Sequence, residues 1–471
     1  MTKVALHNLG CKVNAYELEF IQQMFTRNGY EIVPFDEKAD IYIVNTCTVT
    51  NIADRKSRQM LHRAKKRNPE ALVVATGCYV QTDRAEAVGD ESIDLMVGNN
   101  RKKEIVRLVE ELLEERRAGL SEKTIGACPF EKDAAVPDIA AENMYEEFRL
   151  ERAGGHTRAY IKIQDGCNQF CSYCIIPYAR GRVRSRREED VLAEIRGLAE
   201  NGYQEVVLTG IHLSSYGLDF YKDEEQPDIS YNAAAAKGGF TNANLLSLIR
   251  QVHEIDGIRR IRLGSLEPRI ITEEFLEGLA GLPKFCPHFH LSLQSGSDTV
   301  LKRMNRRYDV REYYEKTELI RRYFVHPALT TDVIAGFPGE TEEEFEETRM
   351  FLQKIDFYEV HVFKYSRRHG TAADLMPNQL TEKEKAERSG VLIKESAERG
   401  RNYRAWYLGK QIDVLFEEGK EIDGICYQMG YTKEYVTTAV RTEKNLGNQI
   451  IPGRADGMLT DEILVFSGKL E

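Results

Sequence analysis

The chain has 471 residues, 42% hydrophobic and 30% charged, with a formal net charge of −10. This length predicts two to three domains, and the acidic balance disfavours a protein coated in phosphate contacts while permitting a local basic patch. No apolar run approaches a membrane span, and the N-terminus leads into a strand-like run without signal-peptide anatomy, so we expect a cytoplasmic protein with no membrane partner.

The first hundred residues alternate between short apolar strands and amphipathic helices, which predicts a parallel sheet covered on both faces. The expected strands are Val4–Leu9, Asp40–Asn45, Ala71–Thr76 and Leu95–Val97, and the expected helices are Asn14–Arg27, Ala53–Arg67 and Lys102–Arg116. We assign residues 1–117 to this N-terminal α/β domain. Residues 118–150 show no clear period and hold several glycines and prolines, so we expect a linker there.

From Tyr160 the alternation restarts, and six β/α units predict a partial parallel (β/α)6 barrel within residues 151–400. The expected strands are Tyr160–Gln164, Glu205–Thr209, Arg260–Gly264, His288–Gln294, Leu329–Ala335 and Glu359–Tyr365. The segment Leu218–Asn242 interrupts this pattern and is expected to be a surface insertion. Such barrels carry their chemistry at the carboxyl ends of the strands.

The pattern of alternating strands and helices ends after a charged helix expected at Thr381–Tyr407. Short strands with polar turns are expected at Gln411–Phe416, Tyr435–Val440 and Ile463–Phe466, which fits a small β-barrel within residues 401–471. The whole chain is therefore expected to be an α/β protein, with an N-terminal parallel α/β sandwich, a central partial barrel and a small C-terminal β-barrel.

Three cysteines, Cys167, Cys171 and Cys174, follow the first expected barrel strand with the spacing C-x3-C-x2-C. The chain has nine cysteines and no export signal, which favours metal or catalytic roles over disulfides. Three thiolates can hold three irons of a four-iron cubane and leave one iron open to chelate S-adenosylmethionine. The alternatives are a zinc site and a buried helical stripe; Gly166, Asn168 and Pro177 argue for a loop and against the stripe.

A second set of cysteines is scattered along the N-terminal domain. Cys11, Cys47 and Cys78 each stand just past the end of an expected strand. Because the carboxyl ends of parallel strands share one edge of a sheet, these three thiols are expected to converge and to hold a second cluster with an open iron. The alternative is that all three are ordinary buried cysteines.

Polar and glycine residues at the barrel strand ends are candidates for binding S-adenosylmethionine, with ordinary turn chemistry as the alternative for each. These candidates are Tyr173, Thr209, Gly210, Ser265, Glu267, Ser292, Gln294 and Asp332.

A dense basic run lies directly downstream of the C-x3-C-x2-C loop. It contains Arg180, Arg182, Arg184 and Arg186. A basic run beside a radical site in an acidic protein favours contact with RNA phosphates over a simple solvated loop.

With these motifs, nearly the whole chain resembles the radical S-adenosylmethionine methylthiotransferases. The matching segments are Leu9–Asn14, Asn45–Thr50, Thr76–Gln81, Gly166–Arg186, His290–Ser297, Thr331–Glu340 and Phe363–Ser366. The resemblance implies two [4Fe-4S] clusters, S-adenosylmethionine as co-substrate, and a C-terminal TRAM-like RNA-binding domain. It also implies an outside electron donor such as flavodoxin or ferredoxin.

Within that family, Gly10–Asn14 and Cys171–Arg182 resemble the branch that adds a methylthio group to C2 of threonylcarbamoyladenosine, next to the tRNA anticodon. The resemblance implies that S-adenosylmethionine is cleaved at the cluster on Cys167, Cys171 and Cys174, and that the cluster on the other triad offers the sulfur. An anticodon loop suits this chemistry because its bases are unpaired. The alternatives are methylthiolation of isopentenyladenosine or of a ribosomal-protein aspartate, and a non-enzymatic iron–sulfur protein that binds RNA.

Overall fold

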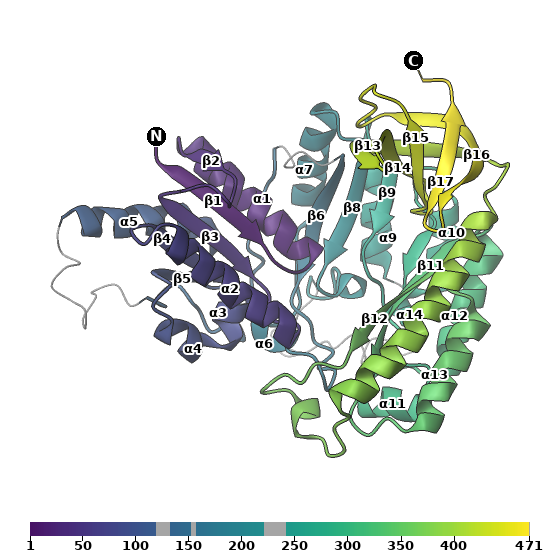
Figure 1. Ribbon diagram of the computed structural model, residues 1–471, viewed down its shortest axis with the longest axis horizontal. Coiled ribbons are helices and arrows are strands. Elements are labelled where there is room, and N and C mark those ends of the chain that lie inside the picture. Colours follow the sequence, from purple (N-terminus) through teal and green to yellow (C-terminus); the bar gives the residue numbers. More distant parts are fainter. Residues whose placement is uncertain (119–131, 152–156, 221–241, 471) are drawn as a thin grey trace.

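A computed structural model describes residues 1–118, 132–151, 157–220 and 242–470. The N-terminal α/β unit lies at one end, the central barrel follows it, and the C-terminal β-barrel sits against the side of the central barrel (Figure 1). Most of the expected 218–242 insertion and the middle of the expected linker lie outside the described residues. Within the described residues, no helix is long and apolar enough to span a membrane.

The N-terminal unit is a parallel sheet with helices on both faces, as its hydrophobic pattern predicts. Its strands run in the order β2-β1-β3-β4-β5. They are β1 (Lys3–Asn8), β2 (Glu31–Val33), β3 (Ile41–Thr46), β4 (Leu72–Gly77) and β5 (Leu95–Val97). The sequence did not predict β2, which has only three residues and an exposed first position, too little to set a period.

Each face of this sheet has its own apolar core. One face is covered by α1 (Lys12–Arg27) and α5 (Ile105–Arg117), with the short 3-10 turn η1 (Lys102–Glu104) just before α5. The other is covered by α2 (Asn51–Arg67), α3 (Cys78–Thr82) and α4 (Arg84–Gly89). Phe148, from the expected linker, stacks on Phe20 of α1 with ring centroids 4.5 Å apart, so this part of the linker packs on the domain.

The central unit contains the six expected parallel strands. They are β6 (Arg158–Asp165), β8 (Glu205–Gly210), β9 (Arg260–Leu263), β10 (His288–His290), β11 (Ala328–Ala335) and β12 (Glu359–Lys364). A bridge between Leu266 and Leu291 joins the β9 side to the β10 side. Among the described strands β12 does not pair with β6, so the barrel is open. A two-residue strand, β7 (Arg184–Ser185), adds antiparallel to β6.

Helices surround the outside of this open barrel around one large apolar core. They are α7 (Glu188–Glu200), α9 (Ala243–His253), α10 (Glu273–Ala280), α11 (Asp298–Arg303), α12 (Val310–Tyr323) and α13 (Glu342–Ile355), with 3-10 turns η2 (Leu213–Ser215) and η3 (Pro268–Ile270). The short helix α6 (Ile176–Arg180) lies instead at the junction with α3 of the N-terminal unit, and the 3-10 turn η4 (Ala372–Leu375) packs on a small separate apolar cluster. The long helix α14 (Glu382–Ala405) lies beside β12 (Figure 1), where the Ser396 hydroxyl accepts a hydrogen bond from the Val360 N–H at 2.9 Å.

The C-terminal unit is the closed β-barrel that the sequence predicts, with two more strands than expected. Its strands are β13 (Gln411–Ile422), β14 (Ile425–Tyr431), β15 (Thr437–Arg441), β16 (Ile450–Thr460) and β17 (Ile463–Gly468). The sequence did not predict β16, because it contains Pro452, Gly453 and Gly457 and these residue types disfavour strands. Arg260 joins the two barrels by donating to the carbonyls of Tyr431 and Asp413, both at 2.8 Å.

Candidate active site

The loop that carries Cys167, Cys171 and Cys174 leaves the carboxyl end of β6 and returns to α6. Gly166 makes the turn possible: its φ is +71°, and a Cβ there would lie 1.8 Å from the Arg182 carbonyl oxygen. The Cys167 N–H donates to the Gly181 carbonyl at 3.0 Å, which closes the loop. The segment is therefore a loop at a strand end and not a helical stripe.

The three thiols of this loop lie near one another and have hydrogen-bond donors aimed at their sulfurs. Burial raises the pKa of Cys174 to about 12 and also raises that of Cys167, and the neighbouring thiols add to both shifts. The Gln169 N–H lies 3.5 Å from the Cys167 Sγ, and Arg306 Nη1 lies 3.3 Å from the Cys171 Sγ. Donors of this kind stabilise sulfurs that carry negative charge, as they do in an iron–sulfur cluster.

The second triad converges at one edge of the N-terminal sheet, as strand-end placement predicts. Cys11 precedes α1, Cys47 follows β3, and Cys78 opens α3 directly after β4. Gly10 has φ +103°, and a Cβ there would lie 2.9 Å from the Cys47 Sγ, so the two loops touch. Burial, together with the nearby thiols of Cys78 and Cys11, raises the pKa of Cys47 to about 12.

The chemistry of both triads fits a four-iron cubane, in which each thiolate binds a different iron and three thiolates leave one iron open. Within the described part of the chain, no three His, Cys, Asp or Glu side chains are arranged to hold one metal ion.

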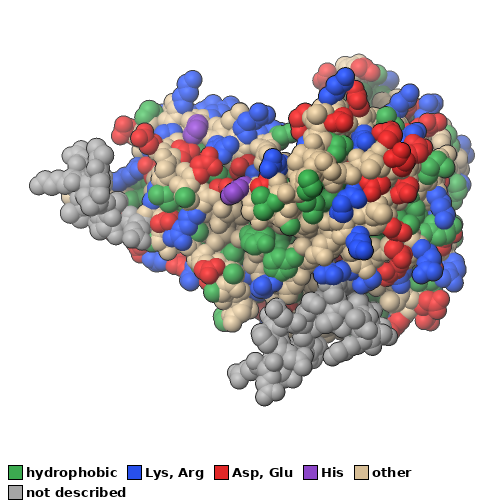
Figure 2. All heavy atoms as spheres, turned by 90° about the horizontal axis from the view of Figure 1, so that it is seen from below, with side chains coloured by type: hydrophobic (Ala, Val, Ile, Leu, Met, Phe, Trp, Pro, Cys, Tyr) green, Lys and Arg blue, Asp and Glu red, His purple; other side chains and the backbone are tan. Residues whose placement is uncertain are grey.

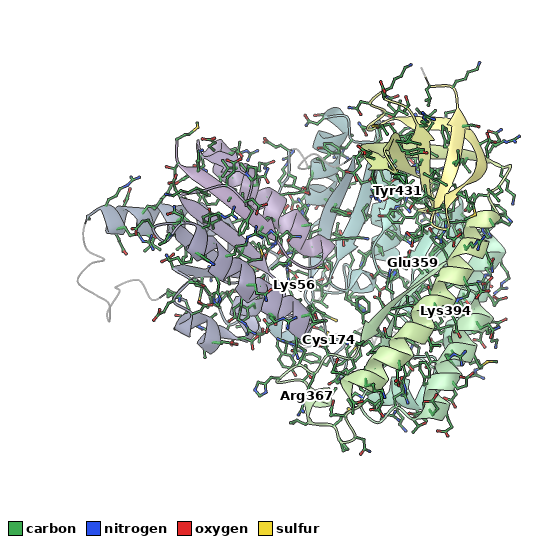
Figure 3. All side chains as sticks on the ribbon, in the orientation of Figure 1. Lys56, Cys174, Glu359, Arg367, Lys394 and Tyr431 are labelled. Carbon is green, nitrogen blue, oxygen red and sulfur yellow. The ribbon has the colours of Figure 1, made fainter. Side chains whose placement is uncertain are left out.

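One pocket of about 260 Å³ lies between the two triads. Val49 and Thr50, close after Cys47, form one wall, and Cys174 with Ile175 forms another. It is also lined by Tyr173, Gln294, Asp332, Ile334, Phe363, Lys364, Tyr365 and Ser366. Cys174 lies at the junction of the N-terminal unit and the central barrel (Figure 3). The pocket is therefore lined by one thiol of the first triad and by the residues that closely follow Cys47 of the second.

The rim of this pocket is partly apolar. Val49, Ile52 and Phe363 have 48%, 54% and 47% of their surface exposed. In the view from below, hydrophobic side chains gather near the middle of the face, among interspersed charges (Figure 2). Exposed apolar side chains beside a pocket mark a place where a ligand binds.

The structure brings three of the eight candidate S-adenosylmethionine contacts into this pocket: Tyr173, Gln294 and Asp332. Glu267 and Ser292 lie close by, since Arg306 Nη2 is 3.4 Å from the Glu267 carboxylate and from the Ser292 carbonyl. The remaining candidates, Thr209, Gly210 and Ser265, stand at or just beyond the ends of β8 and β9. Their contact with S-adenosylmethionine stays a prediction.

Arg306 is a site residue that sequence reasoning missed. It is buried, it touches Cys171, and its Nε donates to the Tyr308 hydroxyl at 3.0 Å. Its position after α11, between Asn305 and Arg307, carries no motif. Only the fold brings it to the cysteine loop.

The predicted RNA-contacting run needs correction. Arg180, Arg184 and Arg186 have at most 1% of their surface exposed. Arg180 and Arg184 pair with Asp165, and Arg186 pairs with Glu147 and Glu194. A guanidinium group enclosed by carboxylates cannot reach a phosphate, so these three are structural; Arg182, over the Phe170 ring at 4.6 Å, keeps partial exposure.

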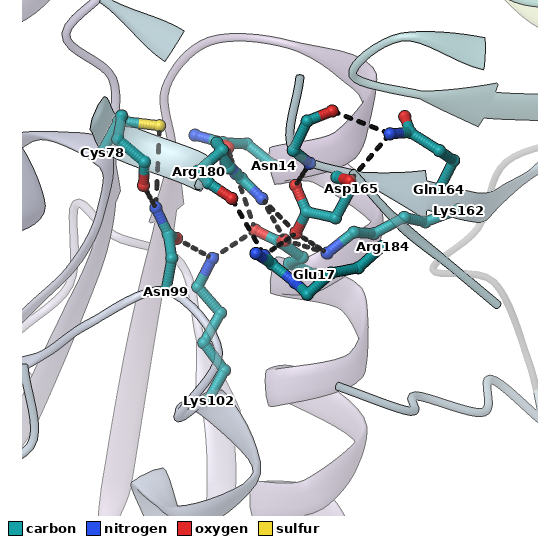
Figure 4. A network of polar contacts seen from close by, with 12 residues as sticks. Asn14, Glu17, Cys78, Asn99, Lys102, Lys162, Gln164, Asp165, Arg180 and Arg184 are labelled. Carbon is teal, nitrogen blue, oxygen red and sulfur yellow. Dashed lines mark hydrogen bonds and ion pairs between the residues drawn. The ribbon is translucent and has the colours of Figure 1, made fainter. Parts of the chain in front are cut away.

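A buried charge network joins the N-terminal unit to the barrel next to both triads (Figure 4). Its centre is Glu17 on α1, which is 1% exposed. Glu17 accepts from Arg180 Nη1 at 2.5 Å and Lys162 Nζ at 2.7 Å, and it also pairs with Lys102. Arg180 Nη2 lies 2.5 Å from the Asn14 amide oxygen, so the network reaches the Cys11 loop.

A second buried contact fixes the Cys47 side of the pocket. Arg368, in the segment after β12, donates to the Asn51 amide oxygen at 2.9 Å and to Asp54 at 3.2 Å. It also donates to the Thr48 hydroxyl, one residue after Cys47. The Asn51 N–H donates to the Ser366 hydroxyl at 2.9 Å. These bonds hold the Cys47 loop against the open side of the barrel.

Comparison with known proteins places the same two regions in described families. Residues 161–352 match the radical SAM superfamily, and residues 3–98 match a family described as uncharacterized protein family UPF0004. The chain is 39% identical to the threonylcarbamoyladenosine tRNA methylthiotransferase MtaB of Bacillus subtilis (strain 168), over 96% of this chain and 93% of that protein. The protein of the same name from Aquifex aeolicus (strain VF5) is 38% identical, over 88% of this chain and 93% of its own length.

A tRNA-2-methylthio-N(6)-dimethylallyladenosine synthase from Thermoanaerobacter sp. (strain X514) is 33% identical, over 88% of this chain and 81% of that protein. Among solved structures, the radical S-adenosylmethionine methyltransferase TsrM from Kitasatospora setae superimposes with a TM-score of 0.52 at 17% identity, covering 90% of this chain and 79% of that one. This structural likeness shows the fold alone.

We expect the substitution Glu17→Gln to lower the free energy of unfolding by about 3–5 kcal/mol, because it leaves buried cations without their counter-charge. Urea unfolding of anaerobically prepared protein, followed by circular dichroism, measures this. The matched control is Glu114→Gln on the exposed side of α5, which should change stability by less than about 0.5 kcal/mol. Equal stability of Glu17→Gln and wild type would contradict a central role for this carboxylate.

The Glu17 contribution should also depend on pH in one direction. Burial alone would raise the pKa of Glu17, but Arg180, Lys102 and Lys162 outweigh it and hold the pKa well below the usual 4.5. A carboxylate with a depressed pKa stabilises the folded state fully above its unfolded pKa and loses this effect as the pH falls through its folded value. The stability difference between wild type and Glu17→Gln should therefore stay constant down to about pH 4.5 and shrink below it.

Proposed function

The chain belongs to the radical S-adenosylmethionine methylthiotransferases, and from this premise we propose that it adds a methylthio group to C2 of threonylcarbamoyladenosine in tRNA. The observation that carries the proposal is the pocket lined by Cys174 of one triad and by the residues after Cys47 of the other. The relatives that share 33–39% identity over most of the chain, and that bear the name of this activity, support the choice of substrate.

We assign one [4Fe-4S] cluster to Cys167, Cys171 and Cys174, and a second to Cys11, Cys47 and Cys78. When bound, the clusters and S-adenosylmethionine supply one-electron chemistry, a transferable sulfur and a methyl group. In each triad three thiolates leave one iron of a cubane free, which suits a reacting centre better than a structural cluster with four protein ligands.

The protein's own residues position the reactants and shield them from water. Tyr173, Gln294 and Asp332 present a ring, an amide and a carboxylate to the pocket, the groups that S-adenosylmethionine and a nucleobase need for stacking and hydrogen bonding. The exposed apolar side chains of Val49 and Phe363 stand where an extruded base enters. Arg306 places a fixed positive charge against Cys171.

We further propose the anticodon loop as the region of tRNA that enters this pocket, because an unpaired nucleotide is extruded at little cost. The C-terminal β-barrel, within residues 401–471, is our choice for the RNA-binding domain, since small barrels of this kind bind single strands. A small redox protein such as flavodoxin or ferredoxin is proposed as the electron donor, and the cytoplasm as the site of action.

Nucleoside mass spectrometry of bulk tRNA tests the substrate directly. Cells that lack this protein should lose methylthio-threonylcarbamoyladenosine and accumulate the unthiolated nucleoside, and complementation should restore it. Loss of methylthio-isopentenyladenosine instead would assign the chain to the other tRNA substrate. An unchanged tRNA profile would contradict the proposal and favour the ribosomal-protein aspartate.

The second triad is tested by Cys47→Ala. We expect this variant to release 5′-deoxyadenosine from S-adenosylmethionine under reduction, because the first triad is intact, but to transfer no sulfur to tRNA. The matched control is Cys426→Ala on β14, an exposed cysteine that should leave both activities unchanged. Methylthiolation by Cys47→Ala would show that this triad does not supply the sulfur.

A further inference from the structure

One cation beside the pocket lacks a counter-charge. Lys12 is exposed to solvent and directly follows Cys11 in the second triad. Its ammonium has no hydrogen bond or ion pair with any residue that the structure describes, and it lies 6.0 Å from the centroid of the Tyr160 ring. The backbone of Lys12 adjoins the second triad, because consecutive Cα atoms are only about 3.8 Å apart.

Protein nevertheless surrounds Lys12 on several sides. Besides the Tyr160 ring of β6, its charged neighbours are Arg158 of β6, Arg262 of β9 and Asp332 of β11. A side chain that is exposed to solvent and yet has neighbours from three barrel strands around it lines a concave surface. Figure 1 shows the turn between β1 and α1 facing the open side of the barrel, between β6 and β12.

This concave surface continues into the pocket. Asp332, which lines the pocket, is also a charged neighbour of Lys12. The His290 Nε2 lies 3.1 Å from the Asp332 carboxylate, and the His290 ring stacks on His361 at 5.5 Å. His361 is two residues before Phe363 on β12, which lines the same pocket.

The carboxylates within reach of Lys12 already have partners. Glu205 is held by Arg262 at 2.9 Å, and Asp332 by His290. Arg158, another charged neighbour of Lys12, pairs with Glu417 at 2.6 Å. None of these groups has to neutralise Lys12, so its charge remains available to a ligand.

The cations on the barrel side of the pocket differ from Lys12 in this respect. Lys364 pairs with Glu382 at 3.0 Å, and Arg367 pairs with Asp374 at 2.5 Å. Arg306 lies 3.4 Å from Glu267, and Arg368 lies 3.2 Å from Asp54. An anionic ligand that entered from the pocket would have to displace a carboxylate at each of these positions but at Lys12 would displace only water.

Resting on the proposed function, we propose that Lys12 binds the free carboxylate of the threonylcarbamoyl group and so selects this substrate. That group joins the amino nitrogen of threonine to N6 of adenine through a carbonyl and leaves its α-carboxylate free. An isopentenyl group offers no anion. A charge-assisted hydrogen bond in a partly desolvated site is strong, and leaving Lys12 unpaired beside an apolar substituent is unfavourable. The two effects together give discrimination.

The test compares two anticodon stem-loop RNAs, one with threonylcarbamoyladenosine and one with its carboxylate blocked as the methyl ester. KM and kcat for methylthiolation are measured with cluster-loaded wild type, Lys12→Gln and Lys12→Arg. The matched control is Lys394→Gln, an exposed lysine on α14 on the far side of the barrel (Figure 3). It should behave as wild type on both RNAs.

We expect Lys12→Gln to raise KM for the acid RNA by about 10- to 100-fold with a smaller change in kcat, and Lys12→Arg to restore most of the loss. Wild type should lose a similar factor on the ester, and Lys12→Gln should lose little more. An equal penalty on both RNAs would show that Lys12 binds a backbone phosphate, and an unchanged KM would show that it binds neither; each overturns the proposal.

Further results distinguish a failure of this inference from a failure of cluster loading or of the proposed function. If Lys12→Gln does not load its clusters, Lys12→Met, which keeps the length of the side chain without its charge, takes its place on both RNAs, and the ester measured with wild type still decides whether a carboxylate is recognised. If wild type methylthiolates isopentenyladenosine RNA and not threonylcarbamoyladenosine RNA, the proposed function is wrong and this inference falls with it. An active wild type that treats acid and ester alike overturns only the inference.

Discussion

The arrangement of this molecule depends on one buried carboxylate. Glu17 lies on a helix of the N-terminal sheet, yet two of the cations that neutralise it, Lys162 and Arg180, come from the barrel. A buried charge is tolerated only when it is paired, and here the pairing requires the two units to stay in contact. Because Arg180 also reaches Asn14 beside Cys11, the same contact fixes the first cysteine loop of one triad against the loop that carries the other.

The remaining geometry follows from where strands end. Parallel strands in both units send their carboxyl ends toward the junction, so every cysteine of the two triads stands just past a strand end at that junction, five in loops and Cys78 at the first position of α3. Arg368 closes the opposite side of the pocket with bonds to Thr48 and Asp54. Residues beside both triads, Cys174 from the barrel and Val49 and Thr50 from the N-terminal unit, thereby line one cavity.

Much of this was predictable from sequence because it depends on local patterns. Hydrophobic periodicity was enough to predict the apolar strands. The convergence of the cysteines just past them followed because the carboxyl ends of parallel strands share one edge of a sheet. The buried arginines were mispredicted because the fold brings distant carboxylates against them: Glu17 is 163 residues from Arg180 along the chain, and Glu147 is 39 residues from Arg186. Arg306 and Arg368 escaped notice for the same reason. β14 and β16 were missed because glycine, proline and polar residues break their alternation.

The central claim is that each triad holds its own four-iron cluster at the shared pocket. Iron and acid-labile sulfide analysis of anaerobic protein tests it most directly, on wild type and on two variants that replace all three cysteines of one triad with alanine. The account predicts about eight irons per wild-type chain and about four in each variant. An iron content that did not fall when Cys11, Cys47 and Cys78 were replaced would contradict it.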